Sequence, residues 1–256
     1  MGNRFFVLRQ LTEMSHTLGS PEWDCAILGE GNTSAKVDDE TLYVKASGTQ
    51  LGAMKPSDFV EVQGKVAMAL LERETATDTE IKDILQAAVV GDTNLRPSVE
   101  TVMHALLLAL PGVNFIAHTH PTAVNAIMCS KIAEEAVSHR LFPDEIVCCG
   151  PAPVYVPWTE PGPPLARKIR DLINAYIEQR GYRPKTMLMQ NHGLVAIGST
   201  VDEVLSITSM AVKTFKILLG AYAMGGPAFM ADDMVERLWT RPDEIYRHKL
   251  LTGREI

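Results

Sequence analysis

Apolar residues recur every three or four positions in several segments, a spacing typical of helices that bury one face. The first segment ends at Gly19 and has its apolar side chains at Phe5, Leu8, Leu11, Met14 and Leu18. The same spacing predicts further helices over residues 79–90, 97–110, 122–128, 133–137, 165–180, 201–224, 232–239 and 242–250.

Short apolar runs bounded by turn residues predict strands between these helices. They cover residues 34–37, 41–46, 59–62, 65–70, 113–118, 145–149, 153–156, 187–189 and 194–197. Residues 38–40 join the first two strands as a hairpin, and Gln63-Gly64 joins the next two. Strands that alternate irregularly with helices, several of them in hairpins, predict an α/β fold with helices on both faces of a mixed sheet.

Two histidines at the end of one predicted strand are the first candidates for chemistry. His118 and His120 are two residues apart, so they project from the same face of the strand at a spacing of ~7 Å. His192 lies in a polar Asn-His-Gly corner between two apolar runs and supplies a third nitrogen. A lone histidine is more often an interior residue, but this set of three predicts a metal site.

Two glycine-containing loops flank the first hairpin, at residues 29–34 and 47–49. A hairpin returns the chain to where it began, so both loops lie at the same end of the sheet. Their backbone N–H groups and short hydroxyls suit a phosphate or a carboxylate. Glycine, asparagine and serine are also ordinary turn residues, so either interpretation stays open at this point.

Glu100 lies in the first turn of the helix that Pro97 and Ser98 open, and His104 follows on the same helix face. A carboxylate in a first helical turn also interacts favourably with the helix dipole, which is an alternative to a catalytic role. His104 is interpreted as a packed histidine or as one that supports a site residue.

Composition narrows the classes of partner. The 256 residues hold 24 basic and 31 acidic side chains without a basic run, which argues against nucleic acid and anionic membranes as partners. We see no stretch of membrane-spanning length and no targeting segment at the N-terminus. The four cysteines show no metal or disulfide spacing, which favours a cytoplasmic location. Without a repeat or linker, residues 1–256 are predicted to form one domain.

Five short blocks follow one another along the chain: Gly31-Asn32-Thr33-Ser34, Ser47-Gly48, Pro97-Ser98-Val99-Glu100, His118-Thr119-His120 and Asn191-His192-Gly193. In this order they resemble the class II aldolase/adducin family, which includes fuculose- and rhamnulose-phosphate aldolases and ribulose-phosphate 4-epimerase. They span about residues 25–200, and the remaining residues, about 201–256, form a helical tail. The resemblance implies a three-layer α/β/α fold with a mainly antiparallel sheet, and a homotetramer with sites at subunit interfaces.

The resemblance also implies roles for individual residues. It matches Glu100 to a carboxylate that exchanges protons with the substrate, and Tyr155 to a tyrosine lent to a neighbouring subunit. It matches the metal ligands to His118, His120 and His192, and the phosphate site to Gly31, Asn32, Ser47, Gly48 and Ser98. Sugar-phosphate aldolases commonly have a second serine where this chain has Val99. That difference leaves open a substrate without phosphate, or a phosphate held partly by Arg96.

The predicted activity is therefore that of a metal-dependent carbon–carbon lyase acting on a small sugar phosphate or hydroxy-keto acid. The implied cofactor is Zn²⁺, or another divalent ion such as Mn²⁺ or Co²⁺. Such an ion acts as a Lewis acid on the enediolate that forms beside the substrate carbonyl. Decarboxylation, epimerisation and dehydration use the same chemistry and stay open. A non-catalytic, adducin-like interaction domain is the other class, but retention of three histidines and Glu100 favours the enzyme.

Overall fold

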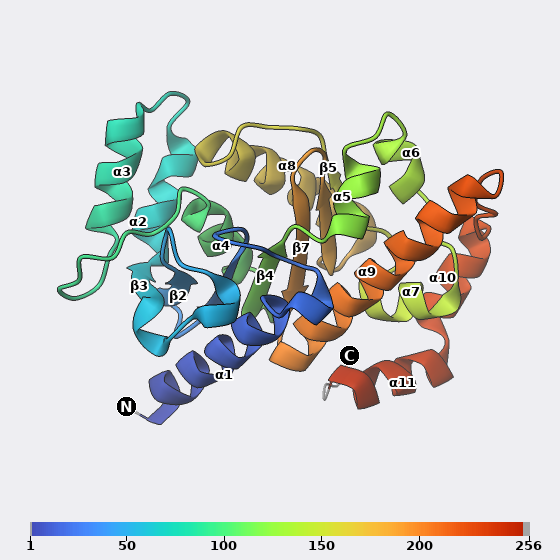
Figure 1. Cartoon of the computed structure of the whole chain (residues 1–256), viewed down its shortest axis with the longest axis horizontal. Coiled ribbons are helices and arrows are strands. Elements are labelled where there is room, and N and C mark those ends of the chain that lie inside the picture. Colours follow the sequence, from blue (N-terminus) through green and yellow to red (C-terminus); the bar gives the residue numbers. More distant parts are fainter. Residues whose placement is uncertain (1, 253–256) are drawn as a thin grey trace.

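The protein is built around one seven-stranded sheet (Figure 1). The structure is a computed structural model that describes residues 2–252, and of residues 2, 3, 248, 249, 251 and 252 the backbone only. The strand order is β3-β2-β1-β4-β7-β6-β5. The strands are β1 Asn32–Lys36, β2 Thr41–Lys45, β3 Phe59–Gln63, β4 Phe115–Thr119, β5 Val154–Val156, β6 Thr186–Met189 and β7 Gly193–Gly198.

Neighbouring strands run antiparallel except for β5 and β6, which run parallel. The sheet is therefore mixed and mainly antiparallel, as predicted. β4 lies at the centre, between β1 and β7. This position matters for the site, because segments from the two halves of the chain meet on either side of β4.

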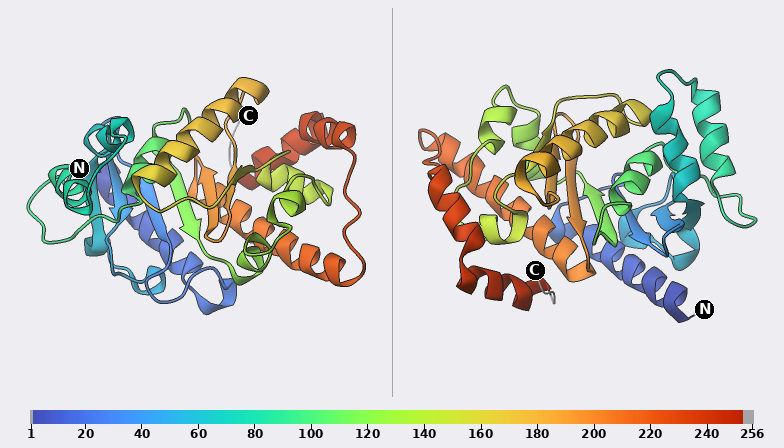
Figure 2. Two further views of the ribbon diagram at one scale, coloured as in Figure 1. Left: turned by 90° about the horizontal axis from the view of Figure 1, so that it is seen from above. Right: turned by 180° about the vertical axis from the view of Figure 1, so that it is seen from behind.

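Helices cover both faces of the sheet. The α-helices are α1 Gly2–Leu18, α2 Gly64–Met68, α3 Asp78–Ala87, α4 Thr101–Leu108, α5 Thr122–Met128, α6 Ala133–Val137, α7 Pro143–Cys149, α8 Pro163–Arg180, α9 Val201–Ala223, α10 Asp232–Thr240 and α11 Pro242–Thr252. The short 3-10 helices are η1 Pro21–Trp23, η2 Leu51–Ala53, η3 Pro56–Asp58 and η4 Ala69–Glu72. Seen from above, α8 lies on one side of the strands and α1 and α9 lie on the other (Figure 2, left).

The side-chain alternation of β4 divides the interior into two cores. Ile116 packs in the core beneath α4 and α8, whereas Ala117 packs in the core beneath α1, α5 and α9. Successive residues of a strand point to opposite faces, so His118 faces the same layer as Ile116. The three-layer α/β/α arrangement predicted from the sequence is confirmed.

Two predicted strands are helices instead. Residues 65–70 fall in α2 and η4, and residues 145–149 fall in α7. Short apolar runs do not distinguish a strand from a buried helix. In the first segment, alanine, methionine and leucine favour helix. In the second, Pro143 occupies the first helical turn with Asp144 and Glu145, a favourable helix start that outweighs the β-branched residues after it.

The prediction that no segment reaches membrane-spanning length is wrong. By length and composition, α9 is long and apolar enough to cross a membrane. In this fold α9 contacts α1, α5, α7 and β7, and it buries residues such as Val204 and Ile207 in the core on that face of the sheet. A core helix passes the same length test, and the packing of α9 is that of a core helix.

Candidate metal centre

The three predicted histidines meet at one end of β4. His118 is the penultimate residue of β4 and lies opposite Val195 of β7, and His120 follows the strand. His192 lies in the turn between β6 and β7, where Asn191 adopts a positive φ of 54°. Since β7 pairs with β4, the turn before β7 returns to the end of β4. Residues more than 70 positions apart are thereby brought together.

Their imidazole rings converge closely enough to share one ion. The ring centroids are 4.8 Å apart for His118 and His120, 4.8 Å for His118 and His192, and 5.3 Å for His120 and His192. One ring nitrogen from each histidine lies within 4.8 Å of those of the other two. The predicted grouping is thus present in the fold.

The protonation of the rings also fits a metal. Burial lowers the pKa of both His118 and His120 to about 4, so they are neutral at pH 7. Nδ1 of His118 lies 3.1 Å from the backbone oxygen of Leu194 and donates to it, which leaves the lone pair of Nε2 directed at the other rings. Neutral imidazoles with inward lone pairs are the ligands that zinc and related ions take.

Glu100 places a carboxylate beside this cluster. It occupies the N-cap position of α4, and its Oε1 lies 3.1 Å from Nε2 of His192 and 3.7 Å from Nε2 of His118. Its Oε2 accepts a 2.6 Å hydrogen bond from Nδ2 of Asn32. Burial raises the pKa of Glu100, but His118, His192 and Asn32 together lower it below its usual value. The carboxylate is therefore ionised at pH 7.

Two glycines allow the close approach of the segments that hold the histidines. Gly31 has a φ of +64°, and a Cβ there would lie 2.6 Å from the backbone oxygen of His118. A Cβ at Gly193 would lie 2.5 Å from the backbone oxygen of Thr119 and 2.8 Å from Cδ2 of His120. Real Cβ atoms do not come this close, so a side chain at either position displaces the metal-site backbone.

We therefore expect Gly193→Ala to lower stability and to weaken metal binding together. Overpacking of this kind costs ~1–3 kcal/mol, and each kcal/mol shifts Tm by roughly 2–4 °C in a protein of this size. Thermal unfolding and metal titration measure the two effects.

The matched control is Gly220→Ala, because a Cβ at this α9 position meets nothing within 4 Å. That substitution is expected to be neutral or slightly stabilising, since alanine favours helix over glycine. Equal Tm values for the two variants would contradict the steric account of Gly193.

The second predicted anion loop, at residues 47–49, meets the segment that precedes α4. Ala46 and Pro97 form an isolated β-bridge, and the backbone N–H of Ser47 donates to the oxygen of Arg96 at 2.9 Å. Ser47 and Ser98 line one cavity of about 560 Å³, whose other lining residues include Arg96, Val99, Lys82 and Arg167. Gly48, next to Ser47, has a φ of +84° and open space around it. The serine hydroxyls and basic side chains give this cavity a polar lining, and His118, His120, His192 and Glu100 are not among its lining residues.

Asn32 makes its side-chain hydrogen bonds within the fold, and its phosphate role stays a prediction. Its side chain is buried, with 5% of its surface exposed, and both ends of its amide are engaged, by Glu100 and by His104. The phosphate role of Asn32 was implied by the family resemblance, and the glycine-containing loop before β1 is compatible with it. The structure shows the side chain turned inward from that loop, beneath α4.

Lys45 is a nearby charged residue that sequence reasoning missed. Its side chain is buried on β2, and its Nζ donates to the backbone oxygen of Gly29 at 3.2 Å. Burial lowers the pKa of Lys45, while the charge of Glu100 raises it. A lysine in the apolar run of residues 41–46 is the signal that could have identified it.

Tyr155 and the three histidines of the same chain lie on different strands of the sheet or beside them, and the structure does not bring them together. Tyr155 is half-buried on β5, opposite Leu188, and burial together with the charge of Glu134 raises the pKa of its hydroxyl. β5 is the edge strand of the sheet, three positions from β4. A role for Tyr155 in the site of a neighbouring subunit stays a prediction.

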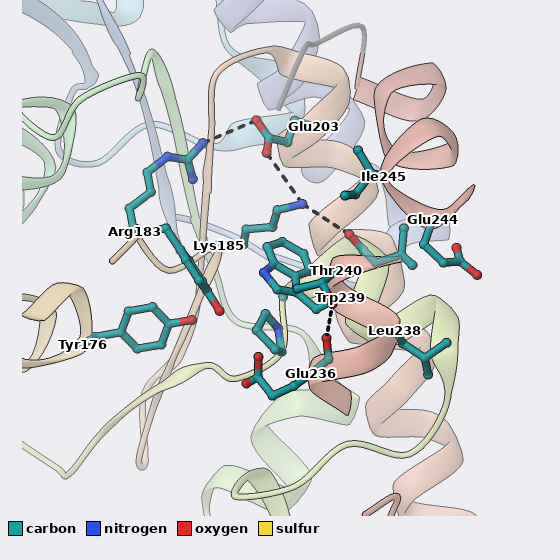
Figure 3. Close-up of a pocket in the computed structure, with 14 residues that line it drawn as sticks. Tyr176, Arg183, Lys185, Glu203, Glu236, Leu238, Trp239, Thr240, Glu244 and Ile245 are labelled. Carbon is teal, nitrogen blue, oxygen red and sulfur yellow. Dashed lines mark hydrogen bonds and ion pairs between the residues drawn. The ribbon is translucent and has the colours of Figure 1, made fainter. Parts of the chain in front are cut away.

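A second large cavity, of about 580 Å³, lies away from the predicted site residues (Figure 3). Trp239, Tyr176 and Tyr182 form aromatic walls, and Lys185 and Glu203 line the same cavity. Nζ of Lys185 lies 4.0 Å from Oε1 of Glu203 and 3.2 Å from the backbone oxygen of Val147. None of the predicted site residues lines this cavity. Despite its size, it is therefore not the candidate metal centre.

Comparison with known proteins agrees with the geometry. Over 209 residues the chain is 30% identical to the protein named uncharacterized oxidoreductase YuxG of Bacillus subtilis, a match that covers 76% of this chain and 27% of YuxG. The chain thus spans about a quarter of the length of that relative. It is 28% identical over 210 residues to methylthioribulose-1-phosphate dehydratase of Yersinia enterocolitica, covering 77% of this chain and 83% of the relative.

A solved structure shares the fold. The N-terminal class II aldolase domain of a conserved protein from Thermoplasma acidophilum superposes with a TM-score of 0.66 and 25% identity, covering 82% of this chain and 92% of that chain. The profile of the family described as Class II Aldolase and Adducin N-terminal domain matches residues 9–219. A match over most of the chain, together with the shared fold, shows that this protein belongs to the class II aldolase and adducin N-terminal domain family.

Proposed function

We propose that this protein is a metal-dependent lyase that cleaves the carbon–carbon bond beside the carbonyl of a ketose phosphate or a related hydroxy-ketone. The observation that supports this most is the position of one carboxylate against the three imidazoles. Oε1 of Glu100 lies 3.1 Å from His192 and 3.7 Å from His118. An ionised carboxylate at the edge of a metal centre is suited to move a proton to or from a bound substrate.

His118, His120 and His192 would hold the ion, and their ligand set suits Zn²⁺, with Mn²⁺ or Co²⁺ as alternatives. When bound, a divalent ion supplies Lewis-acid stabilisation of negative charge that develops on substrate oxygens. Imidazole ligands add no negative charge, so they would leave a bound ion its full positive charge, which favours this chemistry. Burial of His118 and His120 maintains that neutrality.

Glu100 is assigned the proton transfer. Its Oε2 is held by Asn32, so Oε1 is the atom that faces the reacting centre. The surrounding side chains are largely buried, which excludes water and strengthens the electrostatic interactions of the carboxylate. In the proposed reaction, Oε1 takes the proton from the hydroxyl on the carbon that becomes the aldehyde, and after the carbon–carbon bond breaks it returns that proton to the carbon or oxygen that bears the negative charge.

The far end of the substrate is assigned to the loops that contain Gly31, Ser47, Gly48 and Ser98. Ser47 and Ser98 offer hydroxyl groups to a cavity that also has the basic side chains Lys82, Arg96 and Arg167 among its lining residues. The basic side chains favour an anionic end, such as a phosphate or a carboxylate. Val99 contributes an apolar surface to the same cavity, with 45% of its surface exposed.

We expect Val99→Ser to lower KM for a phosphorylated substrate without raising kcat. One added hydrogen bond to a remote group contributes ~0.5–1.5 kcal/mol, or about a 2–10-fold change in affinity. It acts equally in the ground state and the transition state. Steady-state kinetics measures both constants.

Val99→Ala is the matched control, because it removes the same bulk without adding a hydroxyl. An equal gain in both variants, or no gain in either, would favour a substrate whose far end bears no phosphate.

A second candidate reaction is dehydration of a ketose phosphate. The specific observation that favours it is the similarity to the Yersinia enterocolitica methylthioribulose-1-phosphate dehydratase along most of both chains. Decarboxylation and epimerisation would use the same proton transfer. A non-catalytic, adducin-like interaction domain has no need of the histidines and Glu100, and their convergence here favours the enzyme.

The test is a screen of ketose phosphates and hydroxy-keto acids with the zinc-loaded protein. Aldehyde release identifies an aldolase, carbon dioxide a decarboxylase, and loss of water without fragmentation a dehydratase. We expect an aldehyde product that disappears when a chelator removes the metal and returns when the metal is restored. Products that persist at full rate in the chelated protein would contradict the proposal.

We also propose that the chain assembles as a homotetramer in which Tyr155 approaches the site of a neighbouring subunit. The support is the family membership, together with a position of Tyr155 that is remote from the histidines of its own chain. Molar mass in solution, measured with and without Tyr155→Phe, tests the assembly separately from the activity.

A further inference from the structure

Four polar side chains form a buried row that ends at Glu100. Ser34 Oγ lies 2.6 Å from Nδ1 of His104, Nε2 of His104 contacts Oδ1 of Asn32, and Nδ2 of Asn32 lies 2.6 Å from Oε2 of Glu100. Ser34 and His104 are fully buried and Asn32 nearly so. Buried polar groups are hydrogen-bonded in folded proteins, so each member of the row needs its neighbour.

The fold places these side chains in line for simple reasons. Asn32 and Ser34 are two residues apart on β1 and therefore point to the same face of the sheet. Glu100 and His104 are four residues apart and share one face of α4, which packs over that side of the sheet. Asn32 also lies opposite His118 in the pairing of β1 with β4, so the row runs directly up to the metal centre.

The chemistry of the groups gives the row a direction. The carboxylate of Glu100 accepts hydrogen bonds, so Asn32 must turn its NH₂ toward Glu100 and its oxygen toward His104. The oxygen of Asn32 can only accept, so the proton of the His104 ring must reside on Nε2. Nδ1 then accepts from the hydroxyl of Ser34. Burial keeps the ring neutral by lowering its pKa to about 4, in agreement with a single ring proton.

We propose that His104 is a positioning residue that acts through Asn32. The N–H of His104 holds the Asn32 amide in the orientation that donates to Oε2 of Glu100 and thereby leaves Oε1 facing His118 and His192. The inference rests on the proposed function in one respect, that Oε1 moves the proton. Without His104, the Asn32 amide can turn over and direct its oxygen at the carboxylate, which repels it.

The first test uses no substrate. In the zinc-loaded protein labelled with ¹⁵N-histidine, two-dimensional NMR distinguishes ring protonation at Nδ1 from protonation at Nε2. The signal that is lost in His104→Phe is expected to be the Nε2-protonated form, and Ser34→Ala is expected to shift its Nδ1 resonance. A ring protonated at Nδ1, or at both nitrogens, would overturn the proposal. This result stands whether or not the proposed reaction is correct.

The second test is a kinetic double-mutant cycle. His104→Phe and Asn32→Ala are each expected to lower kcat by ~10–100-fold, the usual effect of losing a partner that orients a site residue, with KM and the metal-to-protein ratio unchanged. Because His104 acts through Asn32, the double variant should be no slower than Asn32→Ala alone. Losses that multiply in the double variant would show that His104 acts independently of Asn32 and would overturn the proposal.

Two further variants separate positioning from general structural damage. His104→Gln retains an N–H donor and an acceptor, so it is expected to recover part of the kcat that His104→Phe loses, at a similar Tm. Equal kcat for these two variants would count against the hydrogen-bond role, and the glutamine variant also decides the case if the phenylalanine variant does not fold. His139→Phe, at a half-exposed histidine outside the row, is the matched control and should leave kcat unchanged.

Discussion

Replacing any one of His118, His120 and His192 with alanine is expected to abolish metal binding and turnover together. Each substitution leaves two imidazoles from a set of three whose nitrogens lie within 4.8 Å of one another. Loss of an outer partner alone weakens metal affinity by ~10–100-fold, and loss of a direct ligand costs more. We expect sub-stoichiometric metal after dialysis and kcat below ~1% of the original value, since the chemistry depends on the ion.

The control for this series is His139→Ala, because His139 is half-exposed and lies near Asp232 rather than near the cluster. It should retain both metal and turnover. Metal analysis and kinetics on the same preparations make the comparison direct. A histidine variant with normal metal content and normal turnover would remove that histidine from the site.

Glu100→Gln is expected to separate metal binding from catalysis. The amide has the shape of the carboxylate but does not accept a proton, so the three histidines should still hold the ion. Turnover should fall by ~10²–10⁴-fold, the usual contribution of a positioned proton-transfer group, with little change in KM. The measurement is kcat and KM together with the metal-to-protein ratio of the variant.

Glu13→Gln is the matched control, because Glu13 is an exposed residue of α1 with 65% of its side chain accessible. That variant should behave as the unmodified protein does. Unchanged turnover in Glu100→Gln would show that Glu100 does not transfer the proton and only interacts with the end of its helix. Loss of metal in parallel with turnover would instead make Glu100 a ligand and contradict its assignment as the proton carrier.

The metal cluster could be predicted from the sequence because its signals are local. The spacing of His118 and His120 follows from the alternation of a strand, and the corner that holds His192 is bounded by two apolar runs. The mixed, mainly antiparallel sheet also follows from hairpin patterns such as residues 34–46. Only the family resemblance indicated that His192 lies beside His118 and His120. Spacing along the chain does not determine which strands become neighbours.

The row from Ser34 to Glu100 could not be predicted in the same way. Asn32 follows a glycine-containing loop whose composition indicated an anion site. Its side chain lies beneath α4 because β1 pairs with β4, and the sequence alone does not show that pairing. His104 has no local feature that distinguishes it from a packed histidine. Residues 145–149 form a helix because Pro143 and Asp144 begin it, although the side chains that follow favour a strand. Tertiary neighbours decided the first two cases, and the helix start at Pro143 decided the third.

The most direct test of this account is the metal-to-protein ratio of the purified protein, measured before and after chelation and again after Zn²⁺, Mn²⁺ or Co²⁺ is added. The account predicts about one tightly bound divalent ion per chain, lost on chelation together with activity and regained with it. It also predicts that a variant with all three histidines replaced by alanine takes up none. Absence of metal from the purified protein, with no uptake of any of the three ions, would contradict it.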